Sequence, residues 1–566
     1  MATLRGVTES LGAPLHLRRF RALWLASVFS NLGGFLQAVA ASWLMLELTG
    51  SPAWVAAMAA STTLPLLFLS LPAGAAADLA NRRNVLLSAQ VMMLAAVAAM
   101  SVLDILDGIT PELLLGLGLL LGLGVAVNAP VWQAMVPDLV PRQLVASAVA
   151  LNSISFNAAR AVGPALGGAI VVVAGPGTAF AINAVSYVLV VVVVASFSSS
   201  DWTPQDEASF TRAISLGVRY TRFTPALLWL LGVSAGFAIT SAALQVLLPN
   251  FTQDRLGAGA GMYGLLLGAM GIGALGGGVS RARIGHRLGG HTVPFGIAMY
   301  GAAGVGAGLV TEPWVVAALM AIAGAAWVWT LATLNTTIQA LSHAWVRGRT
   351  MSLYMLAFSG VYPLGSLLAG AIGDGVGVHW AIVGLSSAAV LLGLAALRMP
   401  IIGIDEVAVS EPAYDWDPTP HGDTEIEGGP VMVLNTWVIE EHRLGEFLDA
   451  LAELRLVRLR TGAYRWRLYR NADDPRRMTE AFNVASWEDH LLQHQRIDAA
   501  AAEVIRRARA FDIAEGPTSR HLVAFDVVDP KHRLDWAHLA TQHRHAHAED
   551  GSIPLLSIGP DGDAEV

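Results

Sequence analysis

Long apolar runs without a single charge alternate with short charged segments along the first 400 residues. Runs that contain no Asp, Glu, Lys or Arg include residues 22–46, 51–77, 85–103, 113–136 and 161–200. A helix needs about 20 such residues to cross the hydrocarbon core of a bilayer. The pattern therefore predicts an all-α membrane protein in this part of the chain.

Dividing the apolar runs at charges, prolines and glycines predicts twelve spans. They lie near residues 22–46, 53–77, 84–104, 112–135, 144–173, 178–198, 225–250, 260–280, 290–310, 313–336, 350–372 and 378–397. Six spans fall in an N-terminal half, 1–200, and six in a C-terminal half, 225–400, with a cytoplasmic loop at 201–224 between them.

The two halves also carry matching residues. Gln133 and Gln339 lie 206 residues apart in the fourth span of each half, and Pro164 and Pro363 lie 199 residues apart in the fifth. One short insertion reconciles the two offsets, which differ by about two helical turns. We interpret the match as two six-helix repeats around a central site, as in many transporters, with chance similarity between Leu/Ala/Gly-rich helices as the alternative.

Arginines gather in alternate loops and set the orientation. They are Arg18, Arg19, Arg21, Arg82, Arg83, Arg142, Arg212, Arg219, Arg222, Arg281, Arg283, Arg287, Arg347 and Arg349. The intervening loops carry acidic residues, with Arg255 as the exception. By the positive-inside rule, both termini are predicted on the cytoplasmic side of a bacterial inner membrane. The first span has no evident cleavage site after it, so we expect a retained signal anchor.

Composition agrees with lipid as the solvent. Hydrophobic residues make up 54% and charged residues 14% of the chain, and the mean hydropathy is +0.54, too apolar for a soluble core to hide. The absence of cysteine excludes disulfides and thiol chemistry. The net charge of −8 indicates no particular partner, and we expect none among nucleic acids.

A charged motif follows span 2. Gly74 and Asp78 precede the pair Arg82 and Arg83, a spacing that resembles the loop 2–3 signature of the major facilitator superfamily. That resemblance implies a twelve-helix fold in which Asp78 locks the cytoplasmic side by meeting residues 347–350. A glycine permits close helix approach, and a carboxylate at a helix end can accept hydrogen bonds and pair with Arg. The alternative is a set of flanking charges that only obey the positive-inside rule.

The motif is imperfect and unevenly repeated. Asn81 stands where the family usually has its second glycine, and Leu79 where it usually has Arg. The counterpart after span 8, at 278–287, keeps glycine and arginine but has no acidic residue, so we expect asymmetric gating.

A second motif lies inside span 5. Arg160, Gly163, Pro164, Gly167 and Gly168 resemble the Gly-Pro-x-x-Gly-Gly element of exporters in the same superfamily. Pro164 cannot donate to the carbonyl of Arg160, and the glycines form a small-xxx-small face, so the helix should pack tightly and bend. Arg160 lies about 20–25 Å into the span at about 1.5 Å per residue. An arginine at that depth is by default functional, and a structural arginine bound by carbonyls is the alternative.

Polar and aromatic residues inside the spans are candidates for a substrate cavity. They are Asn31, Gln37, Asn128, Trp132, Gln133, Asn152, Asn157, Gln245, Asn250, Trp327, Trp329, Asn335 and Gln339. Any one of them is more often a helix-packing hydrogen bond, but together they favour a large amphipathic small-molecule substrate. No acid lies at the centre of a span, so a proton-coupled mechanism would have to use Glu47, Asp78 or Asp374 near helix ends.

The composition changes after residue 400. Residues 401–429 read as a linker, because 405–429 is acidic and rich in Pro and Gly. Residues 430–530 alternate as strand 431–439, helix 444–460, strands 463–470 and 479–486, helix 487–510 and strand 521–527, an order that predicts an α+β ferredoxin-like cytoplasmic domain. Residues 531–566 are expected to be a disordered tail, with metal binding by its histidines as a weaker alternative.

Two segments of this domain extend the resemblance. Residues 462–466 and 486–494 resemble the tail of the enterobactin-exporter-like, or transmembrane secretion effector, branch of the superfamily, and the domain resembles the dimeric α/β-barrel of antibiotic-biosynthesis monooxygenases. The resemblance implies an exporter of siderophore-like or other amphipathic molecules, and a homodimer through the domain. We expect no catalytic residue, metal or cofactor. The alternatives are an active cofactor-free monooxygenase using His490, His494, Trp466 or Trp487, and a membrane sensor that transports nothing.

Overall fold

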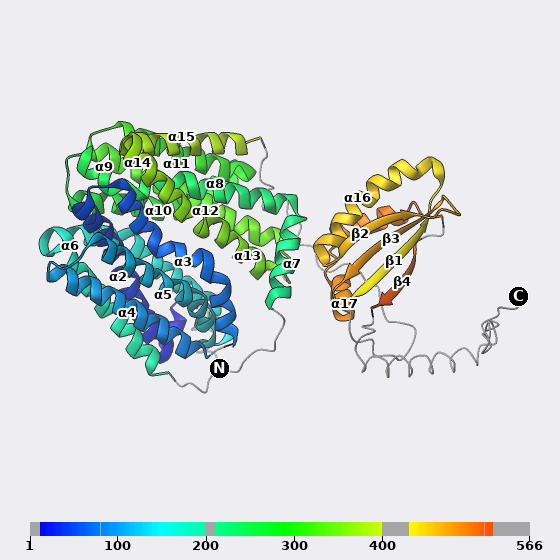
Figure 1. Ribbon diagram of the computed structural model, residues 1–566, viewed down its shortest axis with the longest axis horizontal. Coiled ribbons are helices and arrows are strands. Elements are labelled where there is room, and N and C mark those ends of the chain that lie inside the picture. Colours follow the sequence, from blue (N-terminus) through cyan, green and yellow to red (C-terminus); the bar gives the residue numbers. More distant parts are fainter. Residues whose placement is uncertain are drawn as a thin grey trace, which may run out of the picture. The chain divides into compact units, whose positions relative to one another are not determined.

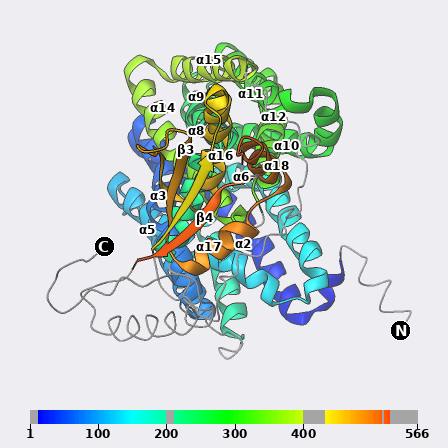
Figure 2. The same cartoon turned by 90° about the vertical axis from the view of Figure 1, so that its right-hand side faces the viewer.

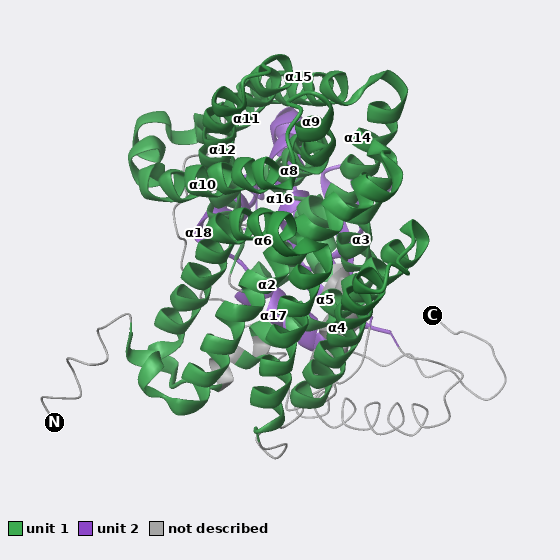
Figure 3. Cartoon of the chain, turned by 90° about the vertical axis from the view of Figure 1, so that its left-hand side faces the viewer, with its two compact units in different colours: residues 1–409 green, residues 410–566 purple. Residues whose placement is uncertain are grey.

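The computed structural model describes residues 12–79, 81–197, 210–343, 345–398, 430–513 and 516–524. The chain divides into two compact units, residues 1–409 and 410–566 (Figure 3). The predicted linker at 401–429 and the predicted tail at 531–566 lie outside the described residues.

The first half of the membrane unit is built from long helices joined by short turns. They are α2 (Arg18–Thr49), α3 (Pro52–Leu79), α4 (Arg82–Ile105), α5 (Pro111–Asp138) and α6 (Val145–Ala195). Local sequence sets their ends. Gly50 closes α2 in a left-handed conformation at φ 64°, and Asn81 caps α4 by accepting from the Asn84 amide.

The second half of the membrane unit is also built from helices. Its helices are α7 (Phe210–Arg222), α8 (Pro225–Val246), α9 (Leu248–Asp254), α10 (Ala260–Leu288), α11 (Thr292–Leu309), α12 (Pro313–Leu341), α13 (Arg347–Met355), α14 (Tyr362–Val376) and α15 (Val378–Ala396). A π-helical turn, Leu356–Gly360, separates α13 from α14 inside the predicted span 350–372. In Figures 1 and 2 the two halves, blue to cyan and green, form two bundles side by side.

Among the described residues, ten helical stretches are long and apolar enough to cross a membrane. Two of the ten are far longer than one crossing needs, Arg142–Ala195 with 54 residues and Ala260–Leu309 with 50. Gly175, at φ 79°, breaks the helical backbone within the first, and a 3₁₀ turn at Gly289–His291 divides the second. The membrane helices are thus established, and a count of twelve stays a prediction.

The described residues of the second unit form one four-stranded sheet and three α-helices. Its elements are β1 (Val431–Val438), α16 (Leu444–Thr461), β2 (Tyr464–Arg470), β3 (Arg477–Val484), α17 (Trp487–Gln495), α18 (Ala499–Arg509) and β4 (Thr518–Val523). The strand order is β2-β3-β1-β4 with every neighbouring pair antiparallel. Alternate residues of β1 are buried, and Trp437 packs with Phe447 and Leu451 of α16.

Several boundaries in this unit differ from the sequence prediction. The strands predicted at 479–486 and 521–527 begin earlier, as β3 (Arg477–Val484) and β4 (Thr518–Val523), and residues 525–527 lie outside the described residues. The largest difference concerns the second predicted helix. The segment 487–510 forms two helices rather than one, because Asp498 accepts from the Ala501 amide and starts α18 afresh. Apolar residues recur on both sides of that cap, so periodicity alone does not mark it. Trp487 of α17 belongs to the buried cluster of Val433 and Phe482, and Ile505 of α18 belongs to that of Trp437 and Phe447.

Candidate functional site

A polar cavity lies inside the first half of the membrane unit. Two adjoining hollows of about 600 and 560 Å³ share Ser30, Asn31, Gln90, Asn128 and Phe156 and are lined by α2, α3, α4, α5 and α6. The lining contains amides, hydroxyls and aromatic rings, and none of these lining residues is acidic or basic. Volumes of several hundred Å³ are typical of sites for drug-sized ligands.

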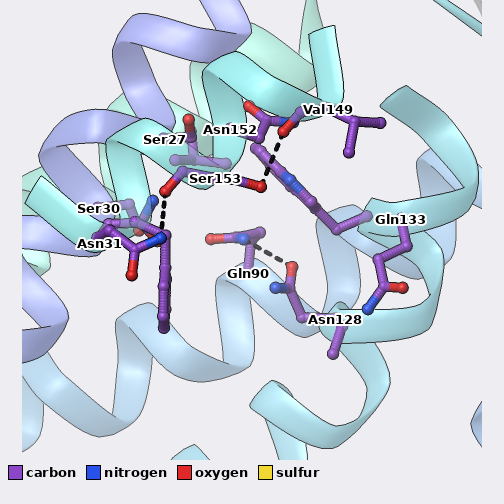
Figure 4. A pocket seen from close by; sticks show the side chains of 14 residues that line it. Ser27, Ser30, Asn31, Gln90, Asn128, Gln133, Val149, Asn152 and Ser153 are labelled. Atoms are coloured by element: carbon purple, nitrogen blue, oxygen red, sulfur yellow. Dashed lines mark hydrogen bonds between the residues drawn. The ribbon is translucent and has the colours of Figure 1, made fainter. Parts of the chain in front are cut away.

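Amide groups face one another across the cavity (Figure 4). Gln90 Nε2 donates to Asn128 Oδ1 at 2.9 Å, which ties α4 to α5, while Gln90 Oε1 is buried with no partner among the described residues. Asn31 Nδ2 donates to Ser155 Oγ at 3.3 Å, which ties α2 to α6. The cavity therefore offers both donors and acceptors without any fixed charge.

The structure places all seven first-half candidates along this cavity. They are Asn31, Gln37, Asn128, Trp132, Gln133, Asn152 and Asn157. Gln37 also accepts a hydrogen bond from buried Asn183. Gln90 is a further lining residue that the sequence reasoning missed. Its signal was the same as theirs, a single amide in an uncharged apolar run.

The second-half candidates lie elsewhere. Trp329 Nε1 donates to Gly277 O at 3.0 Å and to Ser280 Oγ at 3.1 Å, so this indole joins α12 to α10. Gln339, which is exposed, donates to half-buried Asn335 on the same face of α12. Gln245 lies beside Tyr300, but its Nε2 makes no hydrogen bond of good geometry to a described residue.

The two halves meet through glycines at one end of the bundle. We call the end that carries Arg18, Arg82 and Arg347 the arginine end, and the other the opposite end. An added Cβ at Gly264 of α10 would lie 2.5 Å from the Pro164 carbonyl oxygen of α6 and 2.8 Å from Gly168 Cα. The two backbones are therefore in direct contact toward the opposite end, and no side chain fits between them.

A second seam joins α3 to α14 at the opposite end. An added Cβ at Gly370 would lie 2.5 Å from Ala56 Cβ and 3.0 Å from the Pro52 carbonyl oxygen. Ser51 Oγ donates to the two carboxylate oxygens of Asp374 at 3.1 and 3.2 Å, and the Ala53 amide donates at 3.4 Å. An acceptor carboxylate at the first turn of α3 suits the positive end of that helix.

Toward the arginine end, the glycines of α10 pack against α12 of the same half instead of against α6. Added Cβ atoms at Gly273 and Gly277 would meet the backbone of α12 in the same half, at Ala321 and Ala325. Among the described residues, glycine contacts between α6 and α10 run from Ala260 to Gly271 of α10. These contacts between halves lie toward the opposite end, whereas the larger hollow, lined by Ser27, Gln133 and Val149, lies toward the arginine end.

The predicted gating residues are only partly visible. Gly74 and Asp78 belong to the last turns of α3, where the side chains lie outside the described residues. Arg82 begins α4, and Arg83 Nη2 donates to the Ala195 carbonyl at the end of α6, a contact within the first half. The pairing of Asp78 with residues 347–350 stays a prediction.

The span 5 motif lies on the seam. Gly163 packs on Phe35 of α2 and Gly167 on Leu36, so one face of α6 is pressed against its own half. Pro164 and Gly168 face α10. Arg160 reaches the other half, where its guanidinium carbon lies 5.5 Å from the ring centroid of Trp327. The motif therefore works as a close-packed contact on two sides.

A buried polar cluster occupies the core of the second unit. Glu480 is fully buried and accepts from Asn435 Nδ2 and Trp466 Nε1, both at 2.8 Å, while Arg458 Nε lies 3.4 Å away. A buried carboxylate is tolerated when hydrogen bonds and a cation compensate it. The cluster links β1, β2, β3 and α16.

Three histidines lie next to this cluster. The rings of His490 and His494 lie 4.7 Å apart, as do those of His490 and His521. Burial, and then the neighbouring His521, lowers the pKa of His490 to about 4. Burial, and then His490, lowers the pKa of His494 to about 3, so all three rings are neutral near pH 7. Trp487 packs 5.5 Å from His490.

The hollow beside these histidines has a volume of about 30 Å³. That volume accepts about one water molecule and excludes an organic substrate in this conformation. Among the described residues, no group of three or more His, Asp or Glu is placed to hold a metal ion. The geometry gives no support to the monooxygenase alternative.

Comparison with known proteins now places the chain. The family described as transmembrane secretion effector, within the major facilitator transporters, matches residues 9–527. The chain belongs to this family. Relatives of this transmembrane secretion effector include the Multidrug efflux pump Tap of Mycolicibacterium fortuitum, 27% identical over 409 residues, or 70% of this chain and 97% of that protein. The Staphyloferrin A transporter of Staphylococcus aureus is 26% identical over 166 residues, 29% of this chain and 41% of that protein.

Solved structures share the fold of this transmembrane secretion effector. A bacterial homolog of the human lysosomal transporter Spinster, inward-facing and unoccupied, has a TM-score of 0.54 at 14% identity and covers 71% of this chain and 98% of that chain. The nucleoside transporter NupG has a TM-score of 0.55 at 13% identity, covering 68% and 100%. The chain is a multi-pass membrane transporter of the major facilitator type, and its main role is not enzymatic.

Proposed function

We propose that this transmembrane secretion effector is a secondary active exporter of amphipathic small molecules and works by alternating access. One observation carries the proposal. The halves are joined backbone to backbone at the opposite end, at Gly168 and Gly264, while a polar cavity of about 600 Å³ lies on the other side of that contact. A seam of glycines can separate without leaving side chains interlocked, so rocking of the halves would expose the cavity in turn to each side.

The arginine end is proposed as the cytoplasmic end of a bacterial inner membrane protein, with both termini there. Alternate loops rich in arginine support this orientation. The contacts at Gly168 and Gly264 would then close the transporter toward the outside. The breaks at Gly175 and at Gly289–His291 support a count of twelve spans.

The cavity lining supports amphipathic substrates. Amides such as Gln90 and Asn128 alternate with rings such as Phe156 and Trp132, and the lining itself carries no charge. Such a surface can accept varied polar groups beside an apolar body. The names of two relatives, a multidrug efflux pump and a transporter of staphyloferrin A, extend the proposal to multidrug or siderophore-like cargo.

Gating and coupling are proposed at helix ends. Asp78 would close the arginine end by meeting the start of α13 when the opposite end opens. Proton coupling, if present, would use Asp78, Glu47 or Asp374. Glu47 accepts from Trp43 Nε1 at 2.6 Å. Asp374 accepts a hydrogen bond from Ser51 across the seam between α3 and α14, so protonation of Asp374 would weaken that seam.

The second unit is proposed as a soluble, ferredoxin-like domain of the dimeric α/β-barrel type that dimerises and regulates the transporter. The strand order β2-β3-β1-β4 with helices after β1 and β3 supports this fold. Its sheet has one face covered by helices, while Met432 and Leu522 stay 38% and 51% exposed. That exposed face would be the one shared with a second copy.

The proposal is tested with purified protein in proteoliposomes. We expect efflux of lipophilic dyes or siderophores driven by a proton gradient, slowed by Asp78→Asn and unchanged by Asp107→Asn in an exposed loop. A deletion strain should accumulate the same compounds. If the wild-type protein moves no candidate substrate in either assay, the exporter proposal is wrong, and the membrane sensor becomes the better interpretation.

A further inference from the structure

Arg160 crosses from one half of the transporter to the other. It belongs to α6 of the first half, yet its guanidinium carbon lies 5.5 Å from the ring centroid of Trp327 in α12 of the second half. Phe156, one turn earlier on α6, lines the polar cavity. Arg160 therefore lies at the junction of the cavity and the seam.

The second half presents a wall of aromatic rings at this point. Ring centroids are 5.7 Å apart for Tyr300 and Trp327, 5.6 Å for Trp327 and Phe358, and 6.4 Å for Phe358 and Tyr362. These residues come from α11, α12, the π-helical turn and α14. Tyr300 and Tyr362 are both close enough to interact with the charge of Arg160. A helix with regular geometry would place Phe358 differently, so the π turn contributes to the wall.

The charge at this site has no anion. Among the described residues, no carboxylate, carbonyl or hydroxyl group hydrogen-bonds to the Arg160 side chain, and its defined contact is the face of Trp327. Trp327 is itself only 5% exposed, and its Nε1 donor is buried with no partner in the described part of the chain. Donors in an apolar site are costly when no acceptor meets them.

Arg281 is an arginine of the same protein whose side chain finds its hydrogen-bond acceptors within the fold. Its Nη2 donates to the Ala332 carbonyl at 3.1 Å and to Thr336 Oγ1 at 2.7 Å, both on α12. That arginine joins two helices of one half and has its acceptors in the fold. Arg160 carries the same positive charge and lies between the halves, but no acceptor among the described residues hydrogen-bonds to its side chain.

We propose that Arg160 and Trp327 form a binding site for an anionic group of the transported molecule, of the carboxylate class, with the aromatic wall holding its apolar body. This inference rests on the proposed export function. A guanidinium offers two parallel N–H donors that match a carboxylate, and the indole N–H supplies a third. Since Ala161, the next residue, packs on Gly271 at the seam, a ligand on Arg160 contacts both halves and responds to their rocking.

The test compares ligands that differ in charge but share one ring system. Binding of fluorescein, its methyl ester and cationic rhodamine 6G to the full-length protein in nanodiscs is measured by fluorescence polarisation. The variants are Arg160→Gln, Arg160→Lys and Trp327→Phe, with Arg281→Gln as the matched control. We expect wild type to prefer fluorescein. Arg160→Gln should weaken fluorescein about 10- to 100-fold and leave rhodamine 6G unchanged or tighter.

The remaining variants separate binding from folding. Arg160→Lys keeps the charge and should retain part of the preference, and Arg281→Gln should affect both dyes alike. A wild-type protein without preference for the anionic dye, or an Arg160→Gln variant that loses both dyes equally, overturns the proposal. Dye efflux from proteoliposomes is scored separately. Wild-type efflux of rhodamine 6G supports export even when the anion site fails, and absent efflux with intact anion preference refutes only export.

Discussion

Replacing Gly264 by alanine would place a methyl group against the backbone of α6. The added Cβ would lie 2.5 Å from the Pro164 carbonyl oxygen, about 0.9 Å short of the 3.4 Å at which ordinary contacts begin. The nearest atoms belong to the backbone of Pro164 and Gly168 and cannot rotate away, so the two helices would have to separate. Overpacking of this kind costs about 1–3 kcal/mol. The cost falls on the closed seam and therefore favours the state in which the opposite end is open.

An energy of that size changes the equilibrium constant between the two states roughly 5- to 150-fold, since about 1.4 kcal/mol is tenfold. The chain has no cysteine, so spin labels can be attached at Val173→Cys and Arg255→Cys without removing native thiols. Both residues are exposed, one in each half near the opposite end. Pulsed electron–electron distance measurements in nanodiscs should show a larger long-distance population in the Gly264→Ala protein.

Gly261→Ala is the matched control on the same helix. Its added Cβ would meet Val172 Cγ2 at 3.5 Å, an ordinary contact, so the distance distribution should resemble that of the labelled parent. The reasoning is refuted if Gly264→Ala and Gly261→Ala give the same distribution as the parent, because the seam would then not depend on backbone contact.

Three further predictions concern charges. Asp374→Asn should move the same distance distribution toward the open state by up to about fivefold, because Asp374 accepts from Ser51 and from the first turn of α3. Glu480→Gln should destabilise the second unit by about 3–5 kcal/mol in urea unfolding, while Glu453→Gln, half-exposed beside Arg507, should cost less than about 1 kcal/mol; equal effects would contradict the buried-charge argument. The pKa of His490 is lowered to about 4 in the fold, so the unfolded chain binds more protons below about pH 6.5. Stability should therefore be full above that pH and fall by roughly 3 kcal/mol as the pH drops toward 4, and a melting temperature independent of pH in that window would contradict it.

Much of the architecture follows from the sequence. Hydropathy depends on which residues are present, so the membrane helices, the two halves and the change of composition after residue 400 are visible without any coordinates. Strand and helix order in the second unit is also visible, because alternation and periodicity are local. The break between α17 and α18 was missed, although Asp498 is a common capping residue.

The site depended on tertiary structure. A position along a helix fixes the direction in which a side chain points, but only packing decides which helix it faces. Trp329 and Gln90 look alike in sequence, as polar groups in apolar runs, yet one binds the backbone of α10 and the other faces the cavity. Arg160 and Trp327 are 167 residues apart, and no local pattern connects them. The sequence by itself determined that the chain enters a membrane as helices. The free energy of moving apolar side chains from water into lipid adds up residue by residue along the chain. Only the fold decided which glycines close a seam and which cation meets which ring, because those contacts depend on how two separate halves pack.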